Sequence, residues 1–115
     1  MIKEPTEHCL ILCTCPDLAQ AQTIATALLR ARLAACVNLI PNLHSIYMWQ
    51  GEVEQSQEVQ LVIKTRSALY SDIEQKILTL HSYELPEIIT VPIMSGLDSY
   101  LQWIDHSTDR KATMS

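Results

Sequence analysis

The chain has 115 residues, of which 48% are hydrophobic and 18% charged, with 2 Gly and 5 Pro. This length predicts one domain over residues 1–115, with a core of about 8–106 and a polar, frayed tail over 107–115. The composition excludes a disordered or collagen-like chain, and the net charge of −5 disfavours binding to nucleic acid or an anionic membrane surface, since both need a basic protein surface.

The first predicted element is a buried β-strand over residues 8–14, an apolar run that ends before Pro16. His8, at its start, is expected to be solvated. Three cysteines occupy odd positions along this run and therefore share one face of the strand, namely Cys9, Cys13 and Cys15. Free cysteine is among the most buried residue types, so these side chains are expected in the core.

A helix is predicted to follow, because Asp17 can cap a helix start and satisfy its free backbone N–H groups. Apolar residues then recur at the spacing of one helical face. They are Ala21, Ile24, Ala25 and Leu28, and the pattern continues through Leu29 and Leu33.

The next segments predict a long hairpin. A strand over 36–40 is expected to stop at Pro41, and alternation resumes over 44–49. Gln50-Gly51 marks the turn, because glycine accepts a positive φ at little cost. The return strand covers about 53–64 and is polar near the turn and apolar further on, so the hairpin tip is expected to leave the core.

Ser67 or Ser71 can begin a second helix. Its apolar stripe is Tyr70, Ile73, Ile77 and Leu80. A loop over 81–87, a β-branched strand over 88–93 and a short helix over 98–104 complete the pattern.

The element order, β-α-β-β-α-β plus a final helix, suits an α+β fold of the ferredoxin-like type. Two helices cover one face of such a sheet. The strands are too rich in Ile, Val and Leu for the other face to meet water, and the hairpin has long unpaired edges. Both features predict an oligomer.

A thiol and an imidazole are expected at one end of this sheet. Cys13 ends the first strand and His81 follows the second helix. These side chains favour copper and zinc over magnesium or calcium. Two ligands are too few for a closed tetrahedral site, so metal binding and simple burial of the cysteine both remain open.

A second, polar group has its own alternatives. Lys64 lies in an apolar strand with Glu58 on the same face, and Tyr83 and Glu87 lie in the loop before the last strand. A charge inside such a strand is either paired or placed at a binding cleft. The group therefore predicts an ion pair between subunits or a ligand site.

The templates of catalysis are missing from the sequence, which has two glycines and hence no glycine-rich phosphate loop and no Gly-x-Ser-x-Gly elbow. We expect a protein that is not an enzyme.

No apolar run approaches the roughly 20 residues that span a bilayer, and residues 1–5 carry acid and proline where a signal peptide is basic and apolar. A cytoplasmic location is expected, where the four cysteines stay thiols.

Five ordered blocks carry a resemblance to a known family. They are residues 12–14 with 16–17, 33–38, 46–51, 58–65 and 83–88, which read LCT, PD, LAACVN, IYMWQG, EVQLVIKT and YELPEI. Over roughly 8–106 the chain resembles the CutA family, the divalent-cation tolerance proteins. The resemblance implies a very stable homotrimer with an architecture similar to PII signalling proteins, in which the hairpins join neighbouring sheets.

The resemblance also implies a role in tolerance of copper and other divalent cations. In bacterial members copper ligation is attributed to a first-strand cysteine, which corresponds to Cys13, and to two successive histidines. The second histidine corresponds to His81, whereas the first position is Leu80 here. We therefore expect a metal-binding or metal-responsive homotrimer with a weak copper site, in which Cys15 could replace the missing ligand.

The alternative implied by the PII-like architecture is a sensor. It would bind a small anionic ligand in the cleft between subunits, through Trp49, Glu58, Lys64, Tyr83 and Glu87.

Overall fold

The computed structural model describes residues 6–110. Four antiparallel strands form one sheet in the order β2-β3-β1-β4. The elements are β1 (His8–Cys15), α1 (Leu18–Arg30), β2 (Cys36–Trp49), β3 (Glu52–Arg66), the 3₁₀ helix η1 (Ser67–Leu69), α2 (Tyr70–Leu80), β4 (Ile88–Pro92) and α3 (Asp98–Ser107). This order confirms the predicted ferredoxin-like arrangement.

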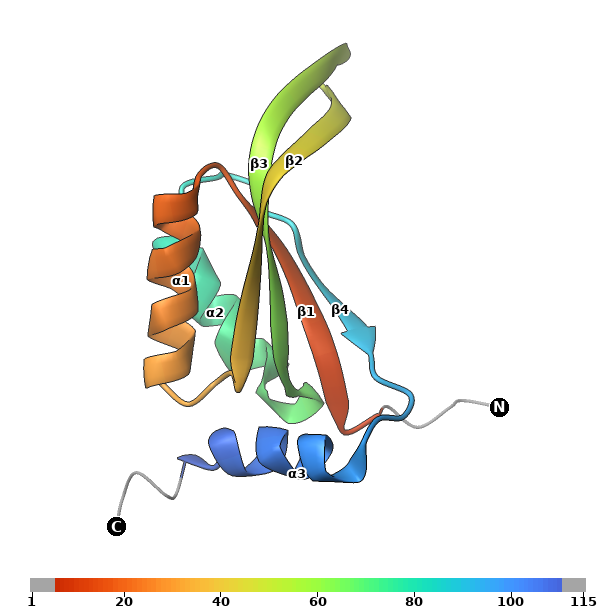
Figure 1. Ribbon diagram of the computed structural model, residues 1–115. Helices are drawn as coiled ribbons and strands as arrows, with labels where there is room; N and C mark the ends of the chain where they lie inside the picture. The colour runs from red at the N-terminus through yellow and green to blue at the C-terminus, as the bar shows by residue number, and fades with distance from the viewer. Residues whose placement is uncertain (1–5, 111–115) are drawn as a thin grey trace.

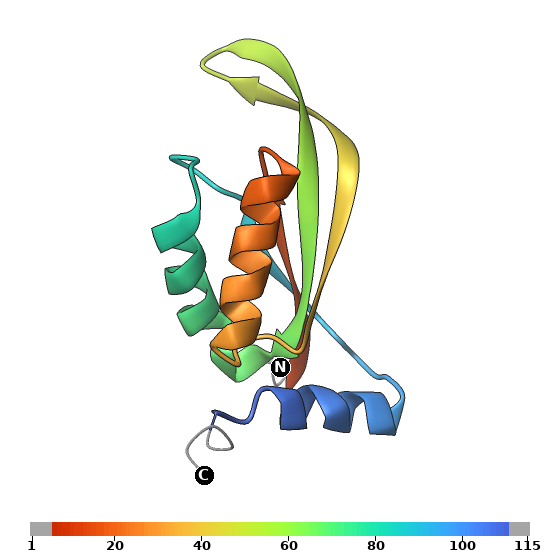
Figure 2. The ribbon, with the colours of Figure 1, turned by 60° about the vertical axis from the view of Figure 1, so that its left-hand side comes forward.

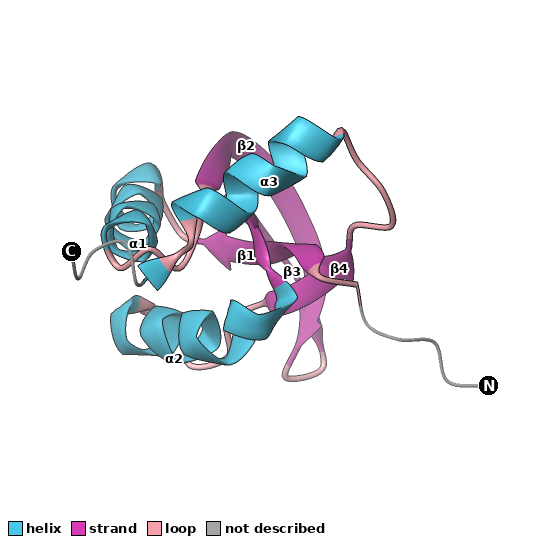
Figure 3. Ribbon diagram, turned by 90° about the horizontal axis from the view of Figure 1, so that it is seen from below, coloured by secondary structure: helices cyan, strands magenta, loops and turns pink. Residues whose placement is uncertain are grey.

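Helices α1 and α2 lie on the same side of the sheet, and α3 crosses the strands at one end (Figures 1 and 3). The core lies between the two helices and the sheet, where β1 and β3 place every second residue under the helices. Its fully buried side chains include Ile11, Ile24, Leu28, Ile63, Ile73 and Ile77. The predicted apolar stripes of both helices therefore face this core.

Helix α1 begins as predicted and ends earlier. The Asp17 carboxylate accepts a hydrogen bond of 2.8 Å from the Gln20 N–H, which caps the helix. The helix stops at Arg30 because Arg32 has a φ of 57°, a left-handed conformation that a helix cannot contain. Leu33 still packs into the core, but from the turn beyond the helix.

The expectation that Pro41 stops a strand is wrong. Strand β2 continues to Trp49, with a register irregularity between Ile40 and Leu43 and a φ of 62° at Asn42. Proline has no N–H for a ladder, but it is tolerated at a bulge on an edge strand, and β2 is such a strand. The hairpin is therefore one long ribbon that bends at its far end (Figure 2).

Neither predicted serine caps the second helix. Helix η1 occupies residues 67–69 first, and no side chain of the described residues caps η1 or α2. The amphipathic stripe located α2 correctly because burial of Ile73 and Ile77 against the sheet stabilises the helix more than a cap does.

Helix α3 is fastened to the sheet by polar contacts, which corrects two expectations. His8, expected in solvent, is 9% exposed, and its Nε2 lies 2.8 Å from Asp105 Oδ1. Thr108, expected in a frayed tail, is fully buried and receives hydrogen bonds of 2.8 Å from Arg66 at its hydroxyl and its carbonyl oxygen. The predicted tail residues 111–115 lie outside the described residues.

We expect Thr65→Val to lower the free energy of unfolding by about 1–3 kcal/mol, because it leaves a buried carbonyl without its donor. Thr65 is fully buried, and its hydroxyl donates to Leu33 O at 2.6 Å. Urea denaturation at fixed protein concentration measures the change. The control Thr90→Val, at an exposed strand position, should stay within about 0.5 kcal/mol; equal losses in both variants would contradict the assignment.

Candidate metal centre

Three side chains of the kind that hold soft metal ions meet at the end of β1. The ligating atoms of Cys13, Cys15 and His81 all lie within 4.8 Å of one another. The two cysteines are two residues apart on one strand and point to the helix-covered face. His81 is the C-cap residue of α2, and its backbone N–H donates to Ile77 O at 2.8 Å. The predicted meeting of Cys13 and His81 is therefore present in the structure.

Cys15 completes the group because β1 continues through this residue. Leu80, at the position where the resemblance implies a histidine, is a half-buried hydrophobic residue packed against the core. The sequence left the role of Cys15 open. Its spacing of two from Cys13 was the signal that could have assigned it, since such residues share a face wherever the strand persists.

Hydrogen bonds identify the tautomer of the His81 ring. Its Nδ1 accepts from the Tyr83 N–H at 3.1 Å, so Nε2 carries the proton and donates to Thr14 O at 2.7 Å. Metal coordination requires a free lone pair on one nitrogen. His81 must therefore release either Tyr83 or Thr14 when it binds a metal ion.

The pKa values of the two thiols are shifted in opposite directions. Hydrogen bonding with the neighbouring Cys15 thiol and burial raise the pKa of the Cys13 thiol well above its usual range. The same hydrogen bond lowers the pKa of Cys15. Cys15 is thus the first of the two sulfurs to become a thiolate, which is the form that binds metals.

A cavity of about 760 Å³ lies beside the cluster. Four of the five residues predicted for a ligand cleft line it, namely Trp49, Glu58, Tyr83 and Glu87. Two of them are joined, because the Tyr83 hydroxyl donates to Glu58 Oε2 at 2.6 Å. Burial and this hydrogen bond raise the pKa of Tyr83 above its usual value.

Lys64 does not line this cavity, so within one subunit the predicted group is divided between two places. Its ammonium donates to Asn38 Oδ1 and lies 3.8 Å from Cys36 Sγ. Glu58 and Lys64 share a face of β3, but six residues of strand separate them by about 20 Å. Alternation identified the face correctly and could not place both residues at one site.

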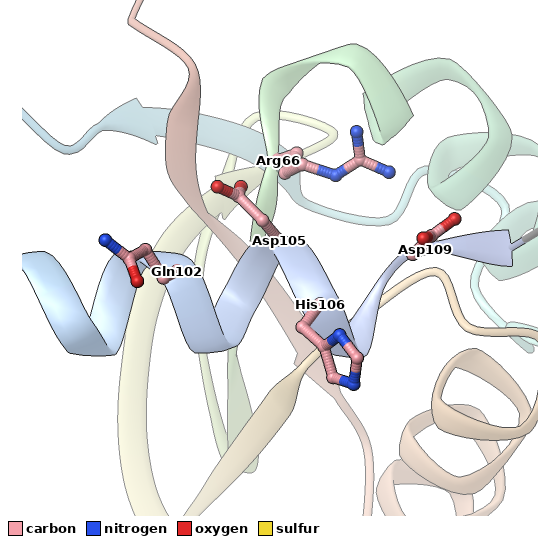
Figure 4. Close-up of a pocket in the computed structure, with 5 residues that line it drawn as sticks. All are labelled: Arg66, Gln102, Asp105, His106 and Asp109. Carbon is pink, nitrogen blue, oxygen red and sulfur yellow. The ribbon is translucent and has the colours of Figure 1, made fainter. Parts of the chain in front are cut away.

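A second hollow, of about 440 Å³, lies along α3 and is lined by Arg66, Gln102, Asp105, His106 and Asp109. Figure 4 shows Asp105 on the same side of the helix as Arg66, whereas His106 points the opposite way. Arg66 already binds Thr108, and Asp105 already binds His8. These groups hold α3 against the sheet through contacts within the chain, so we assign no ligand site to this hollow.

Within residues 6–110, no helix is both long and apolar enough to cross a bilayer. Fold and site together define a small ferredoxin-like α+β protein that presents two thiols and an imidazole at one end of its sheet.

Comparison with known proteins agrees with this class. Residues 9–107 match the family model described as CutA1 divalent ion tolerance protein. The chain is 44% identical over 99 residues to the divalent-cation tolerance protein CutA of Thermus thermophilus, a match that covers 86% of this chain and 96% of that protein. It is 44% identical over 96 residues to protein CutA of Homo sapiens, covering 84% of this chain but 54%, about half, of the human protein.

The crystal structure of the stable protein CutA1 from the psychrotrophic bacterium Shewanella sp. SIB1 is also similar. It superposes with a TM-score of 0.89 at 45% identity, covering 92% of this chain and 99% of that one. The chain therefore belongs to the CutA1 divalent ion tolerance family.

Proposed function

We propose that this protein binds copper through Cys13, Cys15 and His81 and acts as a metal-binding or metal-responsive protein rather than as an enzyme. The observation that carries the proposal is the convergence of three ligating side chains within 4.8 Å. Two sulfurs and one imidazole nitrogen form a soft donor set, which suits Cu(I) or zinc and does not suit magnesium or calcium.

The cluster's geometry supports binding that is moderate and dependent on pH. Three protein ligands leave a further coordination position open. Cys13 must lose its proton, and its pKa is raised by the hydrogen bond to Cys15 and by burial. His81 must also break one of its two hydrogen bonds. Each of these steps lowers affinity relative to a site whose ligands are already free.

We propose a cytoplasmic location, because all four cysteines are free and thiols persist in a reducing compartment.

The PII-like alternative, a sensor of a small anion, lacks support from the cavity. Its lining contains three carboxylates and no Lys or Arg, and Lys64 is engaged elsewhere.

We propose that the protein is a homotrimer, as the family resemblance implies. In the described part of the chain, residues 6–110, one face of the sheet carries no helix (Figures 1 and 3). Register places six apolar side chains on this uncovered face: Leu10, Leu12, Ile40, Val62, Ile89 and Val91. Exposed apolar surface of this kind marks an interface.

Anaerobic titration of the reduced protein with Cu(I), in competition with a chromophoric chelator, tests the copper site. We expect one ion per subunit and an affinity that falls as the pH is lowered, because protons compete for the Cys13 and Cys15 sulfurs. Cys13→Ala should weaken binding strongly. Cys9→Ala is the matched control, since Cys9 is buried on the same face of β1 and lies outside the cluster. Equal affinities of the two variants would reject the ligand assignment.

A further inference from the structure

The cavity beside the metal centre has walls from two distant parts of the chain. Ser45, Tyr47 and Trp49 come from the outer half of the hairpin, and residues 83–87 come from the loop that follows α2. The bend of the hairpin brings its tip over this side of the molecule (Figure 2). A volume of about 760 Å³ is in the range of pockets that hold small molecules.

The charges around this cavity all have one sign. Its lining includes the carboxylates of Glu58, Glu84 and Glu87, and within residues 6–110 no Lys, Arg or His lines it. These carboxylates would therefore repel an anion in the cavity, with no positively charged lining residue to offset the repulsion. The net charge of the whole chain, −5, also favours the approach of a cation.

Glu58 is the buried member of this set, with 8% of its surface exposed. Its Oε2 accepts from the Tyr83 hydroxyl at 2.6 Å, and its Oε1 makes no hydrogen bond with any of residues 6–110. No buried side-chain oxygen of residues 6–110 lacks a hydrogen-bond partner, so this Oε1 stays open to solvent. The cationic head of a small molecule can donate a charged hydrogen bond to it in place of water.

Three aromatic side chains line the same cavity, namely Tyr47, Trp49 and Tyr83. The faces of such rings attract organic cations, and tryptophan does so most strongly. A bare metal ion suits the cavity less well. In the described part of the chain, Cys13, Cys15 and His81 are the one group of three ligating side chains that converge, so the cavity's carboxylates do not form a cage for a hard metal ion.

We propose that this cavity binds a small organic cation that carries an ammonium or guanidinium head on an apolar body. The head donates to the free oxygen of Glu58, and the rings of Trp49 and Tyr83 cover the body. The site is separate from the copper ligands, and the proposal does not depend on copper binding.

Calorimetric titration of the metal-free protein with agmatine tests the proposal, because agmatine carries both types of cationic head. We expect one agmatine per subunit, with heat that decreases as salt is added. Citrate and magnesium serve as the competing probes. Tighter binding of citrate, displacement of agmatine by magnesium, or no binding of agmatine at millimolar concentration would each overturn the proposal.

Two matched variants locate the agmatine site. Glu58→Gln keeps the size of the side chain and an acceptor for Tyr83, and it should weaken agmatine binding by about tenfold to a hundredfold, as expected for loss of a charged hydrogen bond. Glu52→Gln makes the same change on the same strand at an exposed residue outside the cavity, and it should leave the affinity unchanged. Equal affinities of both variants for agmatine would overturn the proposal.

Discussion

Cys15→Ala is expected to weaken copper binding by at least about a hundredfold, since even partners that only orient a metal ligand are commonly worth about 10–100-fold in affinity. The variant removes the sulfur whose pKa is lowered by the Cys13 hydrogen bond, and with it the thiolate that binds first. Chelator competition measures the loss, and Cys9→Ala controls for removal of a buried thiol from the same strand.

A second substitution tests whether Cys15 replaces a lost histidine. Leu80→His in the Cys15→Ala background restores the Cys-His-His set that the family resemblance implies, and it should recover most of the lost affinity. Leu80→His alone should strengthen binding by adding a fourth ligand. An unchanged affinity in both backgrounds would show that residue 80 does not reach the cluster.

Leu12→Asp is expected to prevent assembly. Leu12 lies in the middle of the uncovered sheet face, between Val62 and Ile89 on the neighbouring strands. A carboxylate buried there without a partner costs several kcal/mol at each interface. Sedimentation should give three times the subunit mass of 13.0 kDa for the wild type and the subunit mass for the variant.

The same experiment has a matched control and a measure of folding. Leu78→Asp introduces the same charge at an exposed leucine of α2 and should remain trimeric. Circular dichroism of the Leu12→Asp variant should show the helix and strand signal of the wild type, which tests whether the subunit is folded. The wild-type melting temperature should rise with protein concentration, because assembly stabilises only the folded state. A wild-type mass near 13.0 kDa would contradict the trimer.

Local patterns located most of the elements. Helix α1 was predicted from the Asp17 cap and its apolar stripe, both of which act within a few residues of chain. Helix α2 followed from its stripe alone. The end of α1 was not predicted correctly, because the pattern of apolar residues does not indicate the left-handed conformation of Arg32.

The candidate metal centre was predicted in part. The fold order implied that Cys13 and His81 would meet, and they do. Whether Cys15 joins them depended on how far β1 continues, and pairing of Cys15 with Val59 on β3 settled this point. The hydrogen bonds that hold His81 also depend on residues brought together by the sheet, so the tautomer of its ring could not be predicted from the sequence.

The amino-acid pattern by itself determined which side of each element faces the core, including the shared face of Cys9, Cys13 and Cys15. The tertiary structure alone decided that Glu58 and Lys64 belong to different places, that Pro41 lies inside a strand, and that Thr108 is buried. Periodicity reports the side of an element on which a residue lies. Where along that element a distant segment will meet it depends on strand register and on the bend of the hairpin, which exist only once the sheet has assembled.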